Sequence, residues 1–164
     1  LVEPINNSNI LKDLIVDVSH ETLLISKLNL SIDTNIESTQ ISQEDMKNID
    51  LQSNCILCNS CYSSCPVYDV NKEFLGPFAL TRALRYINDK KNPNRLNIID
   101  SIQTNGIWDC TLCSACTLVC PQGIDPKADI VQLQNISVQN EYSNPYTQSF
   151  DFSDDFGGFN PNGF

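Results

Sequence analysis

The stretch CILCNSCYSSCP, residues 55–66, governs the interpretation of this chain, because its pattern returns as CTLCSACTLVCP at residues 110–121. Both stretches follow Cys-x2-Cys-x2-Cys-x3-Cys-Pro, and together they hold all eight cysteines of the 164 residues. Matching cysteine runs are typical of metal ligands, whereas disulfides are more typical of smaller secreted domains. The sequence therefore predicts two metal centres.

The fourth cysteine of each run distinguishes an iron–sulfur cluster from a zinc site. Zinc ribbons usually have two Cys-x2-Cys pairs separated by a longer stretch. Here three cysteines recur at three-residue steps, a fourth follows four residues later, and proline comes next. This is the run of bacterial two-cluster ferredoxins, in which the fourth cysteine binds the other cluster. It favours two iron–sulfur clusters; the alternative is a zinc-stabilised helical interaction module.

Exchange of the fourth cysteine between the runs predicts the ligands of each cluster. We expect the first cluster to be bound by Cys55, Cys58, Cys61 and Cys120, and the second by Cys65, Cys110, Cys113 and Cys116. Hydrogen bonds near the sulfurs tune the potentials of such centres, and the candidate tuning residues are Ser60, Ser63, Ser114 and Thr117.

No catalytic side chains accompany the two runs. The sequence shows no nucleophile–base pair, and His20, the only histidine, lies far along the chain from either run and is given no role. We therefore expect the chain to move single electrons and to transform no substrate itself.

The rest of the chain predicts an all-helical fold, with each cysteine run between helices. We expect helices within residues 19–30, 42–51, 76–91, 95–103 and 125–133. Ser19 is the expected N-cap of the first helix, Ser42 and Asp45 form a capping box, and Asp125 precedes a proline as the last N-cap. Pro77 suits the first position of the clearest helix.

Composition limits the partners. The formal charge of −10 disfavours nucleic acid and anionic membrane surfaces and favours a protein partner with a basic face. No apolar run reaches the length of a membrane span, and no secretory signal is visible, although the chain begins with Leu1.

The order and spacing of these features resemble a known family. The runs, FLGPFALTRALRYIND between them, and the opening VEPINNSNILKDLIVDVS resemble the C-terminal half of the iron–sulfur subunit of succinate dehydrogenase and fumarate reductase. The resemblance covers about residues 2–137. It implies an alpha-helical ferredoxin domain that passes electrons between a flavoprotein (FAD) subunit and a quinone at the membrane. It also implies a missing N-terminal domain that holds a 2Fe-2S centre.

The expected organisation follows from this resemblance. Residues 1–41 are a linker and short helix after the missing domain, residues 42–142 are the two-cluster domain, and residues 143–164 are a disordered tail. The chain is then a peripheral subunit of a membrane complex, expected on the cytoplasmic face of a bacterial inner membrane.

Three departures from the family pattern are informative. Cys113 stands where the family usually lacks cysteine and has a 3Fe-4S centre, so a second 4Fe-4S cluster is expected. Thr111 replaces a histidine, and Tyr68-Asp69-Val70 replaces a stretch with tryptophan, both of which help form the family's quinone pocket. These departures favour a partner like the cysteine-rich subunit of heterodisulfide reductase over a haem-bearing membrane anchor. The alternative function is a two-cluster subunit of a heterodisulfide-reductase-like or a glycolate or glycerol-phosphate oxidising complex.

Overall fold

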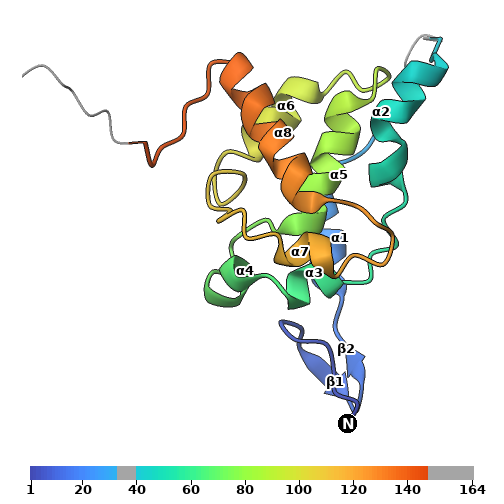
Figure 1. Ribbon diagram of the computed structural model, residues 1–164, viewed down its shortest axis with the longest axis vertical. Helices are drawn as coiled ribbons and strands as arrows, with labels where there is room; N and C mark the ends of the chain where they lie inside the picture. The colour runs from blue at the N-terminus through green and yellow to red at the C-terminus, as the bar shows by residue number, and fades with distance from the viewer. Residues whose placement is uncertain (33–39, 148–164) are drawn as a thin grey trace, which may run out of the picture.

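The computed structural model describes residues 1–32 and 40–147 and has two layers (Figure 1). The longer helices form one layer: α2 (Gln43–Ser53), α5 (Pro77–Asn88), α6 (Arg95–Ser101) and α8 (Pro126–Gln139). The cysteine runs form the other, with the short helices α3 (Ser60–Ser63), α4 (Pro66–Val70) and α7 (Ala115–Leu118). The predicted helical fold is confirmed.

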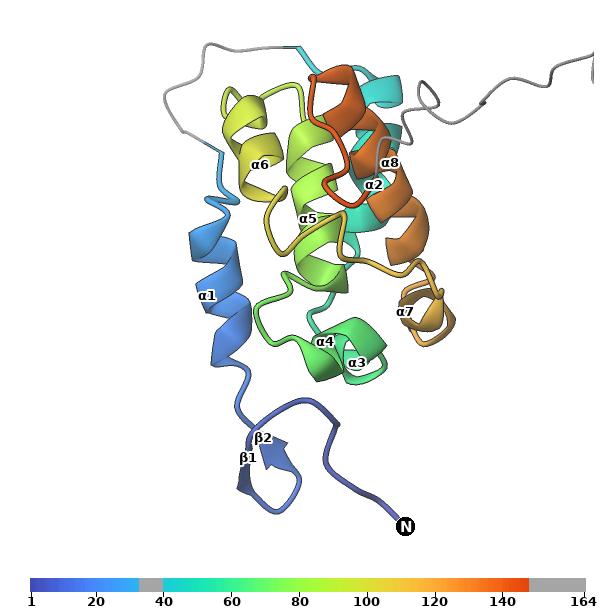
Figure 2. The same ribbon diagram turned by 90° about the vertical axis from the view of Figure 1, so that its left-hand side faces the viewer.

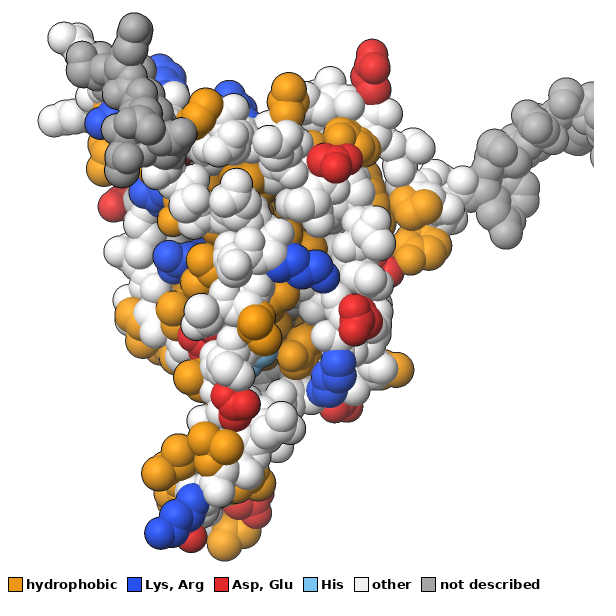
Figure 3. Space-filling model, turned by 180° about the vertical axis from the view of Figure 1, so that it is seen from behind, with side chains coloured by type: hydrophobic (Ala, Val, Ile, Leu, Met, Phe, Trp, Pro, Cys, Tyr) orange, Lys and Arg blue, Asp and Glu red, His pale blue; other side chains and the backbone are white. Residues whose placement is uncertain are grey.

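The segment before the first run lies at the side and end of the molecule (Figure 2). Helix α1 (Ser19–Lys27) runs beside α5 and α6, and strands β1 (Ile10–Lys12) and β2 (Ile15–Val16) form an antiparallel hairpin. Figure 3 shows hydrophobic side chains gathered on this hairpin, where Ile10, Leu11 and Ile15 are exposed.

Helix α5 forms the centre of the hydrophobic core and packs against α1, α2, α6 and α8. Pro77 is its first residue, as predicted, and Leu80, Ala83, Leu84 and Ile87 are fully buried. A fully buried leucine or isoleucine contributes about 1.5–3 kcal/mol. This helix, the strongest helical pattern in the sequence, also packs against α3 in the first cysteine run.

Two predicted helix caps are present. Ser42 Oγ accepts the Asp45 N–H at 3.2 Å, while the Asp45 carboxylate accepts the Ser42 N–H at 3.0 Å, which completes the capping box of α2. Asp125 accepts the Ala128 N–H at 3.0 Å and caps α8.

The predicted cap of α1 is wrong. Val18 holds the N-cap position, and Ser19 is the first helical residue. The Ser19 N–H donates instead to the carboxylate of Asp17 at 2.9 Å. The Asp17 carboxylate thus binds the N–H of the first helical residue, and no side chain caps α1 from the N-cap position.

The chain after α8 folds back toward the second run. Tyr146 donates its hydroxyl hydrogen to the Asp109 carboxylate at 2.7 Å, and the Thr147 N–H donates to the Asn144 carbonyl at 3.2 Å. The predicted disordered tail otherwise falls on residues 148–164, and part of the predicted 1–41 linker on residues 33–39; both ranges lie outside the described residues.

Candidate iron–sulfur centres

The two cysteine runs adopt the same backbone conformation. Leu57 and Asn59 in the first run, and Leu112 and Ser114 at the matching positions of the second, have φ between 54° and 68°. Left-handed residues alternating with right-handed ones turn successive N–H groups toward one concave side, which favours anions and iron–sulfur clusters. A one-turn helix follows each pair, α3 in the first run and α7 in the second, and these two helices pack together.

No glycine in the sequence marks these left-handed positions. Left-handed backbone is unfavourable for a branched side chain such as leucine, so it persists only where the surroundings hold it. The shared leucine two residues after the first cysteine of each run, in CILC and CTLC, was the available hint. The sequence prediction missed these four positions.

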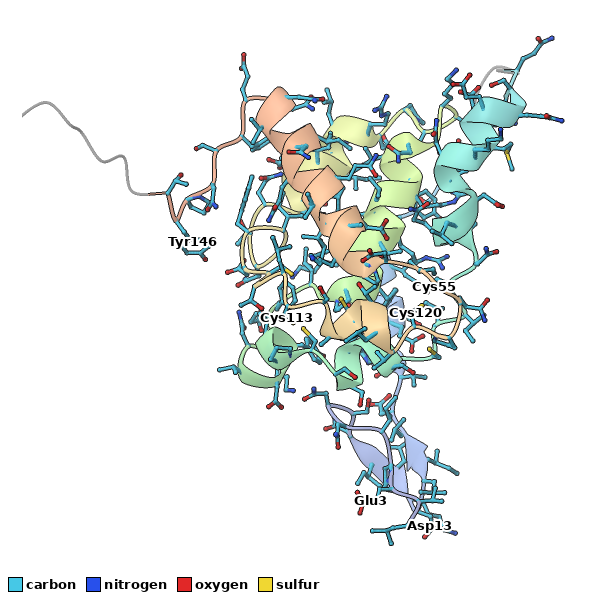
Figure 4. All side chains as sticks on the ribbon, in the orientation of Figure 1. Glu3, Asp13, Cys55, Cys113, Cys120 and Tyr146 are labelled. Atoms are coloured by element: carbon cyan, nitrogen blue, oxygen red, sulfur yellow. The ribbon has the colours of Figure 1, made fainter. Side chains whose placement is uncertain are left out.

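The cysteines line two cavities. The first cavity is lined by Cys55, Cys58, Cys61 and Cys120, together with Thr81, Phe78 and Ile124 among others. The second is lined by Cys65, Cys110, Cys113 and Cys116, together with Val67, Phe74 and Lys127 among others. Figure 4 shows Cys55 and Cys120, from different runs, on one side of the molecule and Cys113 on the other. Each cavity therefore has three cysteines from one run and the fourth from the other run.

The donor set suits a cluster better than a single ion. All eight cysteines are free thiols. Within residues 1–32 and 40–147, no three His, Cys, Asp or Glu side chains converge on a point that could hold one metal ion. A structural zinc needs four ligands about 2.3 Å from a common centre. Four thiols around each cavity, on runs with left-handed residues at matching positions, fit a 4Fe-4S cluster.

Burial keeps the innermost thiols protonated when no metal is bound. Burial raises the pKa of Cys61 to about 12, and the neighbouring thiols of Cys55 and Cys116 add to the effect. Burial likewise raises the pKa of Cys116 to about 11. Cluster ligands are thiolates, so cluster binding must release protons from these positions.

At other cysteines, positive charges and backbone N–H groups act against burial and lower the pKa of the thiol. Burial raises the pKa of Cys55, while the Leu57 N–H and the Arg82 charge act in the opposite direction. Burial also raises the pKa of Cys65, opposed by N–H groups of α4 and by Lys72. The Tyr68 N–H lies 3.4 Å from Cys65 Sγ, and the Leu112 N–H lies at the same distance from Cys110 Sγ. These groups would stabilise bound thiolates.

The fourth cysteines differ in their surroundings. Cys65 is 8% exposed and is itself the N-cap of α4, which begins at Pro66. Cys120 is half-buried, and a turn that includes Gly123 at φ 67° separates it from α8. Proline follows both cysteines, but only the first proline starts a helix.

Two of the four predicted tuning residues approach thiols. Ser60 Oγ lies 3.4 Å from Cys58 Sγ, and the side chain of Thr117 lowers the pKa of Cys116, against the dominant effect of burial. Thr117 also donates to Asp125 at 2.5 Å. Among the described residues, no hydrogen bond joins the side chain of Ser63 or Ser114 to a thiol.

His20 is part of an aromatic cluster beside the first run. Its ring lies 5.3 Å from that of Tyr62, edge to face, and Tyr62 makes a second edge-to-face contact with Tyr68 at 4.7 Å. Gly76 permits this packing, because a Cβ there would lie 2.2 Å from the Tyr62 ring. Sequence reasoning did not find this cluster, whose members come from separate segments.

The structure also locates the residues at which this chain departs from the quinone-pocket residues of the family. Thr111 is exposed at the rim of the second cavity, whereas Tyr68 is buried against Tyr62. Asp69 and Val70 are exposed on α4. None of these four residues is a histidine or a tryptophan.

Comparisons with known proteins agree with this geometry. A family model described as "4Fe-4S dicluster domain" matches residues 52–124. The fumarate reductase iron-sulfur subunit of Haemophilus influenzae is 33% identical over 150 residues, which cover 80% of this chain and 58% of that protein. The 8-methylmenaquinol:fumarate reductase iron-sulfur subunit of Wolinella succinogenes is 31% identical, covering 84% of this chain and 45% of that protein.

More distant relatives extend the match. The mitochondrial succinate dehydrogenase [ubiquinone] iron-sulfur subunit 3 of Arabidopsis thaliana is 30% identical, covering 82% of this chain and 46% of that protein. A chain of the Mycobacterium smegmatis Sdh1 complex in the apo form has the same fold, with a TM-score of 0.70 at 20% identity over 88% of this chain and 63% of that one.

Each of these matches covers only part of the relative's length. The chain spans about half the length of the curated relatives it matches. None of the helices in the described part of the chain has the length and apolar character of a membrane span. With its dicluster domain and two cysteine-lined cavities, the chain is a homologue of the iron–sulfur subunits of fumarate reductase and succinate dehydrogenase.

Proposed function

We propose that this chain carries single electrons through two iron–sulfur clusters, between a flavoprotein subunit and a quinone-linked membrane partner of a fumarate reductase or succinate dehydrogenase complex. The observation that carries the proposal is the division of eight thiols between two cavities, four to each, with one cysteine exchanged between the runs. The names of the relatives supply the reaction class.

The proposed ligands follow the cavities. Cys55, Cys58, Cys61 and Cys120 bind the first 4Fe-4S cluster, and Cys65, Cys110, Cys113 and Cys116 bind the second. Such clusters supply one-electron oxidation and reduction when bound. The protein holds their thiolates, buries them and directs N–H groups at them, which sets the potentials.

Cys113 distinguishes the proposed second cluster from a three-iron centre. The side chain is exposed and lines the second cavity with the three other cysteines. A fourth thiolate completes the set that a four-iron cluster requires. With the replacements at Thr111 and Tyr68, this supports a cysteine-rich membrane partner rather than a quinone pocket of the usual type.

The proposed setting is a peripheral subunit on the cytoplasmic face of a membrane complex. The exposed apolar side chains of the hairpin support docking to another subunit, because an isolated two-stranded sheet is marginal in water. The charge of −10 favours a partner surface that is basic.

Electron paramagnetic resonance of anaerobically reconstituted chain tests the proposal. We expect a silent oxidised state and two interacting signals after reduction with dithionite, because oxidised low-potential 4Fe-4S clusters are diamagnetic. A strong oxidised signal from air-protected protein would show a three-iron second centre and exclude Cys113. Zinc without iron or sulfide would reject the function as a whole.

Transfer to the partner needs a separate measurement. The dithionite-reduced chain is freed of excess reductant and mixed anaerobically with its flavoprotein subunit and fumarate, and the decay of the reduced-cluster signal is followed. Fumarate-dependent re-oxidation supports the assignment to this complex, because low-potential clusters can pass electrons to fumarate through the flavoprotein. A reduced chain that keeps its signal with an active flavoprotein and fumarate would favour one of the related two-cluster complexes.

A further inference from the structure

A buried carboxyl joins three helices behind the first cavity. Asp129 on α8 is 5% exposed, and its two oxygens accept hydrogen bonds from Gln52 on α2 at 2.9 Å and from Thr81 on α5 at 2.8 Å. Thr81 is itself 1% exposed. A buried carboxyl held only by neutral donors is an expensive feature for a fold that could use apolar side chains here.

The three side chains adjoin the proposed first cluster. Thr81 lines the first cavity, and Gln52 precedes Cys55 by three residues. Pro126, the first residue of the helix that carries Asp129, lines the same cavity. The carboxyl is therefore one hydrogen bond removed from the cavity wall, without contacting a cysteine.

The charges around Asp129 do not neutralise it. On its own helix, Asp125 lies one turn earlier and repels a second negative charge. On α5, Arg85 pairs with Asp89 at 3.2 Å, and the charge of Arg82 acts on Cys55.

The charged residues of α2 are also directed elsewhere. Glu44, Lys47 and Asp50 are exposed, and Asp45 pairs with Lys90 at 2.6 Å. Burial raises the pKa of Asp129, the bonds from Gln52 and Thr81 oppose this, and Asp125 adds a smaller upward effect.

We propose that Asp129 is a positioning residue that couples the reduction of the first cluster to protonation: its carboxyl takes up one proton from water when that cluster gains one electron. The inference rests on the ligand assignment of the proposed function. The electron comes from the flavoprotein side of the complex, and the proton balances its charge, so the net charge of this region is unchanged.

The coupling has a simple electrostatic cause. Added negative charge at the cluster raises the proton affinity of a nearby carboxyl across a medium of low dielectric constant. By reciprocity, an ionised Asp129 makes the cluster harder to reduce. The reduction potential of the first cluster must therefore fall as pH rises through the range in which Asp129 titrates.

The second cavity provides an internal control. It is lined by Lys127, and within the described chain no side chain that lines it donates a hydrogen bond to an aspartate or a glutamate, whereas Thr81 of the first cavity donates to Asp129. Lysine stays charged over the pH range of the experiment. The second cluster should therefore keep a nearly constant potential in the same sample.

Redox titrations of the reconstituted full chain, monitored by paramagnetic resonance from about pH 5 to about pH 9, test the inference. We expect the potential of the first cluster to fall by up to about 59 mV per pH unit, the one-electron equivalent of a tenfold change in proton concentration. Asp129→Asn should abolish this slope and raise the potential at high pH.

Two matched variants identify the group responsible. Asp125→Asn keeps a good helix cap and removes the neighbouring carboxylate. Glu21→Gln changes the other buried carboxyl near the first run, which accepts a hydrogen bond from the Asn59 amide. Both should keep the wild-type slope. A slope that persists in Asp129→Asn, or disappears in either control, overturns the assignment.

The wild type alone also gives a decisive measurement. Its reduced-minus-oxidised infrared spectrum should show a protonated carboxyl appearing on reduction, and its absence together with a flat potential would refute the coupling. A chain that binds no cluster contradicts the proposed function, whereas a clustered chain with a pH-independent potential contradicts this inference alone.

Discussion

The two cysteine runs have the same conformation up to their third cysteine and diverge after the fourth. Both place left-handed residues at matching positions and continue into a one-turn helix. Cys65 is then buried as the cap of a helix that begins at once, whereas Cys120 is half-buried before a turn. Because each fourth cysteine lines the cavity of the other run, the segment after one run sets the surroundings of the other cluster.

A duplicated cysteine motif can thus form two cavities whose surroundings differ. The repeated part of each run, up to its third cysteine, supplies three thiols to one cavity. The segments that follow the fourth cysteines are not repeated, and they give the two cavities different surroundings. The first cavity has Asp129 behind it, and the second has Lys127 in its lining. Two similar sequences can thus hold clusters of different potential.

Removing a fourth cysteine should give the largest effect. Cys65→Ser should abolish the second cluster, although its other ligands lie in the second run, and Cys120→Ser should abolish the first. Each variant should retain roughly half of the wild-type iron and sulfide. Iron analysis with paramagnetic resonance checks this, and Ser64→Ala is the matched control. Loss of the cluster of the same run would show that the ligands are not exchanged.

The cluster-free chain should lose stability in alkali. The pKa values of Cys61 and Cys116 in the folded chain, about 12 and about 11, lie above the ordinary value of 9.0. Their contribution is therefore complete below about pH 9 and is lost as pH rises toward the folded values, for Cys61 by about 2–4 kcal/mol at most. Urea unfolding at several pH values measures this.

Two further measurements test the predicted loss of stability at high pH. Cys61→Ala should flatten the fall more than Cys116→Ala, because the pKa of Cys61 is raised further. Cluster uptake should show the opposite trend and improve with pH, because thiolates must form. Equal alkaline loss in all three chains would contradict the role of these thiols.

Replacing by alanine the glycine that follows each run should destabilise the chain to different extents. Gly76 has φ 82°, and its added Cβ would meet the Tyr62 ring at 2.2 Å, whereas Gly123 has φ 67° with open space around it. Left-handed strain alone costs about 1–2 kcal/mol, and the collision adds to it. Gly76→Ala should therefore destabilise the chain by about 2–4 kcal/mol and Gly123→Ala by about 1 kcal/mol, as measured by thermal unfolding. Equal losses would mean that the Tyr62 ring can move aside.

The smallest expected effect concerns the helices that flank the runs. Ser42 caps the helix before the first run and Asp125 the helix after the second. Ser42→Ala and Asp125→Ala should each cost about 0.5–2 kcal/mol. The loss should be greater for Asp125→Ala, because Asp125 also accepts the bond from Thr117 beside Cys116. Denaturant midpoints give the comparison, with Ser26→Ala, at an exposed helical position, as the reference.

Local signals in the sequence predicted much of this structure. The cysteine spacing, the Ser42 capping box and the proline-led helices are patterns of a few residues, and each is present. The start of α1 shows the limit, because Val18 rather than the expected Ser19 holds the N-cap position.

Features that depend on distant partners could not be predicted. Asp129 meets Gln52 and Thr81 across 77 and 48 residues, and His20 meets Tyr62 from another segment. The left-handed leucines are held by their surroundings and have no local glycine to mark them. Tertiary packing decides such positions, and a single sequence does not record it.

The exchanged cysteine also constrains how the protein is made. Cys61 and Cys120 line one cavity but are 59 residues apart in the chain. At about 5–20 residues per second, a ribosome needs roughly 3–12 s to synthesise the interval. For that time the first run exists as an incomplete, oxidisable set of thiols. The four thiols of the first cavity are therefore complete only after the second run has been synthesised, so assembly of this centre must wait for most of the chain.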